Sequence, residues 1–195
     1  MTLVSSGAIS IGGTATNASI EQEINGSTFS SPYTSTASLN DSSLRSLAGV
    51  SSGAISMSNF YGKSSYKYQG TITQGYSYTL HSPAQYMWTY EYGCAPGSFG
   101  SRSPTTLVDG KTMAYWVDHI EYNYDSSIST QYSTLIITGF SSNPGIGYVT
   151  TATVGTTSKS GSSASYGYPV SGQAVWTWTS IFGFGSSGTV SVSIK

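Results

Sequence analysis

The stretch Thr189-Val-Ser-Val-Ser-Ile194 alternates polar and apolar residues over its whole length. Successive side chains of an extended chain point to opposite faces, so its three aliphatic side chains share one face and its two serines share the other. A slip of one residue would turn every aliphatic side chain toward water, and the register of this strand is therefore well fixed. The stretch predicts a β-sheet with one buried face.

The same period of two recurs upstream, from Tyr66 onward. Trp176 and Trp178 share one face of such a segment, opposite Val175 and Thr177, which predicts a strand at least partly covered on both sides. The expected strands are Tyr66–Thr71, Gly75–Leu80, Tyr86–Tyr92, Thr112–Tyr122, Thr134–Phe140, Gly147–Val154, Ala174–Ile181 and Thr189–Ile194. Clusters of Gly, Ser and Pro predict loops at residues 93–104, 141–145 and 155–172. The pattern predicts a mainly β chain with an antiparallel β-sandwich or barrel-like domain.

Residues 1–63 differ from the rest because they hold few aromatics and the only helix-like patterns. Val4-Ser-Ser-Gly-Ala-Ile-Ser10 recurs as Val50-Ser-Ser-Gly-Ala-Ile-Ser56, each copy followed by an apolar residue. The repeat predicts two equivalent short strands, with matching apolar faces. Those faces would carry Ile9 and Ile11 in one copy and Ile55 and Met57 in the other.

Two short helices are expected between the repeats. Residues 18–24 place Ile20 and Ile24 one turn apart. Ser38-Leu-Asn-Asp41 matches a capping box, Leu44, Leu47 and Ala48 then form one apolar face, and Gly49 stands where a left-handed cap is expected. Residues 27–37 read as a polar loop. We therefore expect a small α+β module at residues 1–63, followed by a β-rich domain at residues 64–195.

The composition is that of a folded chain with little charge. Its 195 residues and 20.5 kDa fit one ordinary domain, or a small module joined to a larger one. The net charge is -1, and 8% charged residues with 13% aromatics argue against disorder. So little positive charge argues against charge-driven nucleic-acid binding and against a basic membrane-surface helix.

The ends and the cysteine content indicate a cellular compartment. The start, Met1-Thr-Leu-Val-Ser-Ser-Gly7, lacks the basic residues and apolar stretch of a signal peptide, and no run has transmembrane length. A single cysteine, Cys94, excludes an intramolecular disulfide framework and a cysteine-based zinc site. We expect folding in a reducing cytosol, without secretion or membrane insertion.

Two polar motifs invite chemical interpretations. Gly183-Phe-Gly-Ser-Ser-Gly188 has the spacing of a dinucleotide-binding motif, but only Thr189–Lys195 follow it, too few for a βαβ unit, so we predict a β-turn. The densest polar cluster is Asp118, His119, Glu121 and Asp125. One strand would align His119 and Glu121 on one side, yet a metal needs three or more converging ligands, so we interpret the cluster as a solvated strand face.

Hydrolase chemistry has no clear motif either. There is no Gly-x-Ser-x-Gly elbow, and Cys94 has no near basic neighbour to activate its thiolate. Asp118 with Glu91, or Glu121 with Asp109, would suit glycoside hydrolysis only if the two carboxylates lay about 5 to 10 Å apart in a cleft. We assign no catalytic, cofactor-binding or metal-binding residue, and we expect neither enzyme activity nor a cofactor.

The aromatic residues carry two possible interpretations. Tyr86, Trp88, Tyr90 and Tyr92 fall on one face of a predicted strand. Rings that fill a core or a subunit interface have the same pattern as rings that stack on sugars. The first interpretation is favoured, and the second predicts three or more Tyr or Trp side chains exposed in one shallow patch.

Several segments resemble structural proteins of tailed bacteriophages. Ser38-Leu-Asn-Asp-Ser-Ser-Leu-Arg-Ser-Leu-Ala-Gly-Val50, continuing through Ser52-Gly-Ala-Ile-Ser-Met-Ser-Asn-Phe-Tyr-Gly-Lys-Ser64, is similar to the N-terminal segment of tail and fibre proteins, which commonly have Asp where this chain has Asn59. Three further stretches resemble a β domain repeated in predicted phage tail and fibre proteins: Gly97-Ser-Phe-Gly-Ser-Arg-Ser-Pro-Thr-Thr-Leu-Val-Asp-Gly-Lys-Thr112, Trp176-Thr-Trp178 and Phe184-Gly-Ser-Ser-Gly-Thr-Val-Ser-Val-Ser-Ile194.

The resemblance implies a non-enzymatic part of the virion, assembled in the host cytoplasm: a tail, neck or fibre protein whose residues 1–63 dock onto other virion proteins. Repetition by symmetry implies a homo-oligomer, with a trimer the leading expectation for a fibre. A capsid decoration protein, or a module at a fibre tip that binds a host receptor or glycan, are the alternatives.

Overall fold

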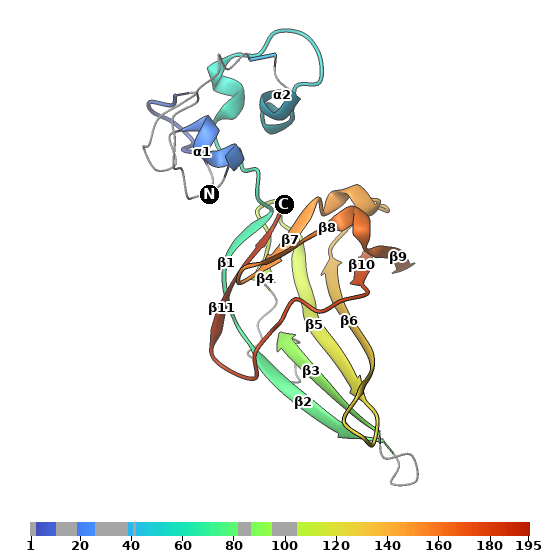
Figure 1. Cartoon of the computed structure of the whole chain (residues 1–195). Helices are drawn as coiled ribbons and strands as arrows, with labels where there is room; N and C mark the ends of the chain where they lie inside the picture. The colour runs from blue at the N-terminus through green and yellow to red at the C-terminus, as the bar shows by residue number, and fades with distance from the viewer. Residues whose placement is uncertain (1–2, 11–18, 26–38, 41, 82–86, 95–104) are drawn as a thin grey trace. The chain divides into compact units, whose positions relative to one another are not determined.

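The computed structural model describes residues 3–10, 19–25, 39–40, 42–81, 87–94 and 105–195 (Figure 1). The chain is mainly β and divides between Tyr66 and Lys67 into two compact units, which are described separately. Each has its own apolar core.

The N-terminal unit contains helices α1 (Ile20–Asn25) and α2 (Ser42–Ala48) and a 3-10 turn, η1 (Met57–Phe60). The predicted apolar face of α2 is confirmed, because Leu44, Leu47 and Ala48 are buried. They pack in one cluster with Ile20 and Phe60. The helix ends as expected at Gly49, whose φ of 71° lies in the left-handed region that glycine favours.

The predicted strands at the repeated motif are wrong. Residues 4–10 and 50–56 form no strand, and the one pairing described there is a single bridge between Ser10 and Ser19. Each copy instead bends at its Ser-Ser-Gly, with Gly7 at φ 96° and Gly53 at φ 83°. Left-handed glycines interrupt an extended chain, so the repeat encodes two equivalent bends. Ile11, the loop at 27–37 and the cap residues Ser38 and Asp41 lie outside the described residues.

The second unit consists of two antiparallel sheets in a sandwich-like arrangement. The short sheet has the order β1 (Tyr68–Thr73), β11 (Thr189–Ile194), β7 (Thr151–Val154) and β8 (Thr157–Ser160). The long sheet has the order β2 (Gly75–Leu80), β3 (Trp88–Cys94), β5 (Thr112–Tyr122), β6 (Ile128–Thr138), β10 (Gln173–Trp178) and β9 (Ser165–Val170), with β4 (Thr105–Thr106) beside the start of β5. Two 3-10 turns, η2 (Ile146–Tyr148) and η3 (Gly161–Ser163), complete the unit.

Most predicted strands are confirmed, with corrections where the side chains are small and polar. The expected loop at 155–172 contains β8, η3 and β9. Strand β6 begins at Ile128 instead of Thr134, and the strand expected from Gly147 begins at Thr151. Many residues of these segments are exposed Ser and Thr, which join the sheets through their backbone groups. Such segments show no alternation of apolar and polar side chains, so the sequence does not predict them as strands.

The core lies between the two sheets. Trp116, Trp176 and Trp178 of the long sheet are buried against Val192 and Ile194 of the short sheet. Ser191 on the opposite side of β11 is exposed, so the predicted register of the C-terminal strand is confirmed. Burying an aromatic side chain of this size contributes about 2 to 3 kcal/mol, which compensates for the scarcity of aliphatic residues.

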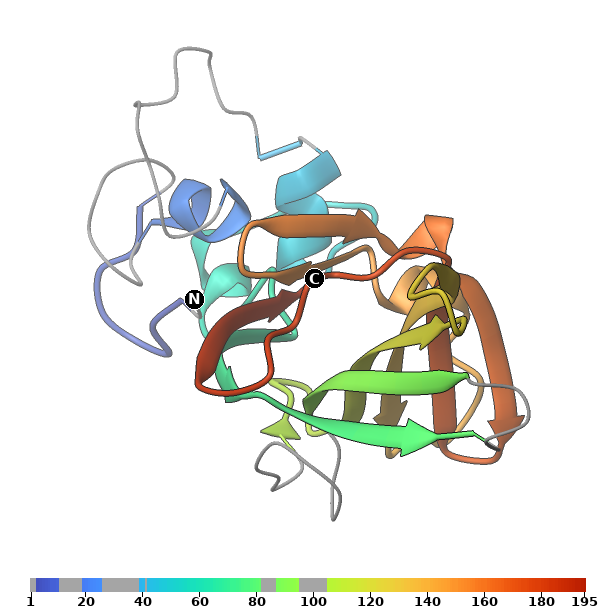
Figure 2. The ribbon, with the colours of Figure 1, turned by 60° about the horizontal axis from the view of Figure 1, so that its bottom comes forward.

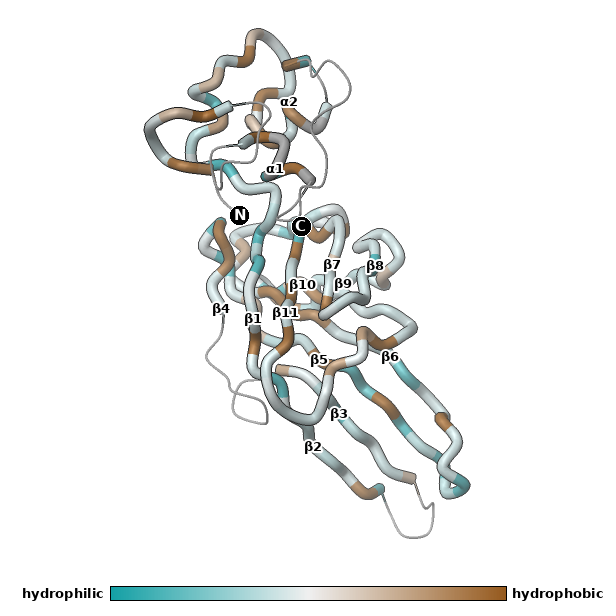
Figure 3. Tube along the Cα trace, turned by 60° about the vertical axis from the view of Figure 1, so that its left-hand side comes forward, coloured by the Kyte–Doolittle hydropathy of each residue, from teal (hydrophilic) through white to brown (hydrophobic). Residues whose placement is uncertain are grey.

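The two sheets differ in length. The short sheet ends at the pair Thr73 and Thr189, whereas β2, β3, β5 and β6 continue beyond it (Figures 1 and 3). One residue, Gln74, separates β1 from β2. Its amide oxygen accepts from the Gly185 N–H at 2.8 Å and its amide nitrogen donates to the Ser187 carbonyl at 3.0 Å. The chain therefore leaves the short sheet at Gln74 and enters the long one.

Candidate interaction surface

The side of the long sheet that faces the short sheet is its inner face, and part of that inner face is not covered by the short sheet. Pairing in register places Tyr76 beside Tyr92, Tyr78 beside Tyr90, and Trp88 beside Tyr122, all on this side. These six side chains, from β2, β3 and β5, are named the aromatic face. The strands that carry them continue past the end of β1 and β11 (Figure 3).

The six rings touch one another as a continuous layer. Tyr90 lies at its centre, 5.6 Å from Tyr92 in a stacked arrangement and 5.1 Å from Tyr78 in a tilted one, measured between ring centroids. Tyr122 meets Tyr90 edge-on at 6.0 Å and stacks on Trp88 at 5.8 Å. These spacings are those of favourable aromatic pairs, so neighbouring rings hold each other in place.

The layer is open to solvent on one side. Tyr76 is 52% exposed and Tyr78 is 50% exposed, and the other four rings are half-buried. Burial and the neighbouring Tyr122, Tyr90 and Tyr76 raise the pKa of Tyr92, so its hydroxyl stays protonated near neutral pH. The patch expected for a glycan site, with three or more exposed Tyr or Trp side chains, is therefore only partly present, because two of the six rings are exposed. Tyr86 lies outside the described residues.

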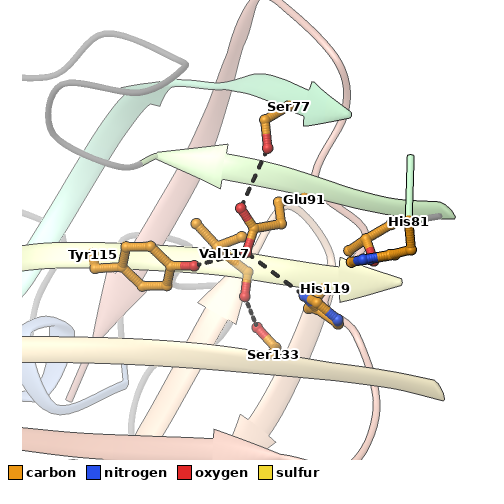
Figure 4. A network of polar contacts seen from close by, with 8 residues as sticks. Ser77, His81, Glu91, Tyr115, Val117, His119 and Ser133 are labelled. Atoms are coloured by element: carbon orange, nitrogen blue, oxygen red, sulfur yellow. Dashed lines mark hydrogen bonds and ion pairs between the residues drawn. The ribbon is translucent and has the colours of Figure 1, made fainter. Parts of the chain in front are cut away.

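The opposite, outer face of the same strands is polar and centres on Glu91 (Figure 4). Its carboxylate accepts hydrogen bonds from Ser77 at 3.3 Å and Tyr115 at 3.4 Å, and His119 Nδ1 lies 3.6 Å away. Burial, followed by the nearby Glu91 carboxylate, raises the pKa of Tyr115. The His119 ring stacks on Tyr132 with centroids 4.4 Å apart.

The polar cluster predicted from the sequence is divided between these faces. His119 lies on the outer face next to Glu91, whereas Asp118 is buried on the inner face, and Asp125 accepts hydrogen bonds from Ser127 in the turn after β5. Among the residues that the structure describes, no three His, Cys, Asp or Glu side chains converge as a metal site would need. His81, at the end of β2, contacts the Thr89 hydroxyl at 2.6 Å.

Asp118 has a structural role that the sequence did not reveal. One carboxylate oxygen accepts from the Phe182 N–H at 2.9 Å, and the other accepts from Gly183 at 2.6 Å and Phe184 at 3.0 Å. The start of the glycine-rich motif, for which the sequence predicts only a β-turn, thus surrounds the Asp118 carboxylate with three backbone N–H groups. With Asp118, the loop closes the covered half of the inner face.

Neither carboxylate pair considered for glycoside hydrolysis shares a cleft. Glu91 and Asp118 point to opposite faces of the long sheet, because Glu91 pairs with His119 and Asp118 pairs with Tyr92. Asp109 lies before the start of β5, where it accepts a hydrogen bond from Tyr148 at 2.7 Å, and Glu121 lies near the far end of that strand. The geometry needed to flank a glycosidic bond is missing from both pairs.

Comparison with protein-family models, with curated proteins and with solved structures finds no match to this chain. In the described part of the chain, no helix is long and apolar enough to cross a membrane.

Proposed function

We propose that this chain is a non-enzymatic structural protein of a tailed bacteriophage particle, in a tail, neck or fibre. Its N-terminal unit attaches to other virion proteins and its β unit faces outward. The observation that carries the proposal is the division into two units with separate cores. Separate cores suit a virion protein that attaches through one unit and makes outward contacts through the other, because each unit can then stay folded by itself. The resemblance of residues 38–64 to phage tail proteins supports the attachment role.

Incorporation into particles tests this proposal. Purified particles of the phage that encodes the chain should contain it, and electron microscopy should place it in a tail, neck or fibre. A chain lacking residues 1–66 should fold, because the β unit keeps its whole core, yet it should be absent from particles. The cut follows Tyr66 because Glu23 accepts hydrogen bonds from Ser64 and Ser65. Normal incorporation of the shortened chain would contradict the attachment role, and density on the capsid would favour a decoration protein.

A second candidate function is binding of a host glycan, and the aromatic face is the observation that favours it. Flat rings exposed on one side offer a surface to the apolar faces of sugar rings, and tyrosine hydroxyls at the rim can bond sugar hydroxyls. Leu80, the exposed side chain of β2 that lies beside Trp88 at the margin of the rings, carries no charge, which suits a neutral oligosaccharide.

A glycan array with the full chain tests this second function. Binding to neutral oligosaccharides should be lost in Tyr78→Ala, because Tyr78 is exposed and contacts the central ring. Tyr124→Ala is the matched control, since Tyr124 is an exposed tyrosine in the turn after β5. Equal loss in both variants, or binding to no glycan, would contradict a glycan site on the aromatic face.

A further inference from the structure

We propose that β2 is a self-association edge, through which two copies of the chain pair antiparallel about a twofold axis and join their long sheets. The inference goes beyond the proposed function because it names the contact and the partner. The backbone and side chains of Gly75–Leu80 alone make the contact, so it does not depend on a role in a virion.

Four strands end the two sheets, β1 and β8 in the short sheet and β2 and β9 in the long sheet, and they differ in how their free edges are protected. A strand at an edge presents unpaired N–H and C=O groups, and natural proteins block such edges with charges, proline or covering groups. The edge strand β8 carries Lys159, and β9 carries Pro169. On β1, Tyr68 folds back along its own strand, with its hydroxyl donating to the Thr71 carbonyl at 3.2 Å. Three edges therefore carry a recognisable protection.

The remaining edge, β2, has no such protection within the part of the chain that the structure describes. Its sequence, Gly75-Tyr-Ser-Tyr-Thr-Leu80, holds neither a charge nor a proline. It pairs with β3 on one side. Its other side is the outer edge of the long sheet, and no described segment pairs with it there (Figure 2). Tyr76, Tyr78, Thr79 and Leu80 are all exposed. An exposed, uncharged edge of this length favours addition of another strand.

The strand is complementary to itself in one register. With Tyr78 opposite Tyr78 of a second copy, Tyr76 lies opposite Leu80 of that copy, and Ser77 lies opposite its Thr79. Pairs of this kind already exist inside the chain, where Tyr78 packs on Tyr90 at 5.1 Å and Leu80 lies beside Trp88. Cross-strand aromatic pairs and Ser–Thr pairs each stabilise an antiparallel sheet.

A second copy fits this edge better than a foreign strand does. Like charges placed opposite each other destabilise a strand pair. Because β2 has no charged residue, pairing with β2 of a second copy places no like charges opposite each other. A twofold axis perpendicular to the sheet also places both aromatic faces on the same side, so the exposed rings of Tyr76 and Tyr78 gain apolar neighbours. Such an isologous contact closes with two copies. The contact is therefore a dimer contact, in contrast to the trimer expected for a fibre.

The mass of the full chain in solution tests the proposal. Light scattering after size exclusion should give twice 20.5 kDa for the wild type. In Thr79→Lys the mass should shift to that of one chain, because a lysine on an edge blocks strand addition. Ser165→Lys places the same charge on the edge strand β9 and should leave the dimer intact. Cooperative circular dichroism melting transitions will show that both variants fold, and the dimeric chains should melt at the higher temperature.

Cysteine cross-linking tests the register. In a Cys94→Ser background, Tyr78→Cys should form an interchain disulfide on mild oxidation, since residue 78 meets itself across the twofold axis. Tyr124→Cys, on an exposed turn, should not. A monomeric or trimeric wild type, a dimer that survives Thr79→Lys, or equal cross-linking at both positions would overturn the proposal.

Discussion

The inner face of the long sheet has two halves with similar side chains and different surroundings. In the covered half, Trp116, Trp176 and Trp178 lie under the short sheet and the loop held by Asp118. In the other half, Tyr76 and Tyr78 head a layer of rings that remains open to solvent. The strands β3 and β5 run through both halves without a break. What decides the environment of an aromatic side chain here is where the opposing sheet ends.

The largest difference between the two halves should appear on truncating one ring in each. Trp176→Ala should lower the free energy of unfolding of the β unit by about 3 to 5 kcal/mol, because the side chain is fully buried and its ring nitrogen donates to the Ile146 carbonyl. Tyr78→Ala should cost less than about 1 kcal/mol, since half of its surface is already exposed. Urea titration followed by circular dichroism measures both. Equal losses would mean that the aromatic face is covered in solution.

A smaller effect is expected at the loop that closes the covered half. Asp118→Ala leaves the N–H groups of Phe182, Gly183 and Phe184 without their acceptor and should lower the free energy of unfolding by about 3 kcal/mol. Asp125→Ala is the matched control, because that carboxylate lies in an exposed turn and accepts only from Ser127. A similar loss in the two variants, in the same urea titration, would show that the loop stays closed without Asp118.

The smallest effect on the free energy of unfolding is expected at alkaline pH, from Tyr115 on the outer face. Burial and Glu91 raise the folded-state pKa of Tyr115 above its unfolded value of about 10, so the neutral phenol is the favoured form in the fold. Its contribution to stability is present below pH 10 and is lost as the pH rises through the folded-state pKa. Tyr115→Phe should remove one of the components of tyrosinate absorbance that appear only above pH 10, and it should lessen the stability loss in that range. Full ionisation near pH 10 in the folded wild type would contradict this.

The sequence predicted strands well wherever one face is apolar, as at β5 and β11. It failed at β8 and β9, whose serine, glycine and proline residues predict a loop. Both segments are ordered as hairpins, by backbone pairing with the strands next to them in the chain, β7 and β10. The apolar residues of the Val-Ser-Ser-Gly repeat alternate locally and predict strands, whereas left-handed glycines bend both copies. Alternation contains no information on glycine dihedral angles.

The candidate surface was only partly predictable for a related reason. Alternation correctly put Trp88, Tyr90 and Tyr92 on one face, but the same rule places Trp116 and Tyr122 on one face of β5, and only one of these two is fully buried. Exposure depends on the end of the short sheet at Thr73, which no local pattern encodes. The neighbours Asp118 and His119 likewise reach opposite faces, and the loop that binds Asp118 is remote in sequence.

The passage of the chain at Gln74 also determines how the β unit would bear a mechanical load. The start of β1 pairs with the end of β11, Tyr68 beside Ile194, so a pull between Lys67 and Lys195 would separate these strands one pair at a time. Separating one pair of residues at a time needs little force. At Gln74 the chain crosses into the other sheet, and the two hydrogen bonds of the Gln74 amide to the 185–187 loop must break together, which needs more force. Gln74 would thus limit the separation to β1 and β11 and leave the long sheet intact.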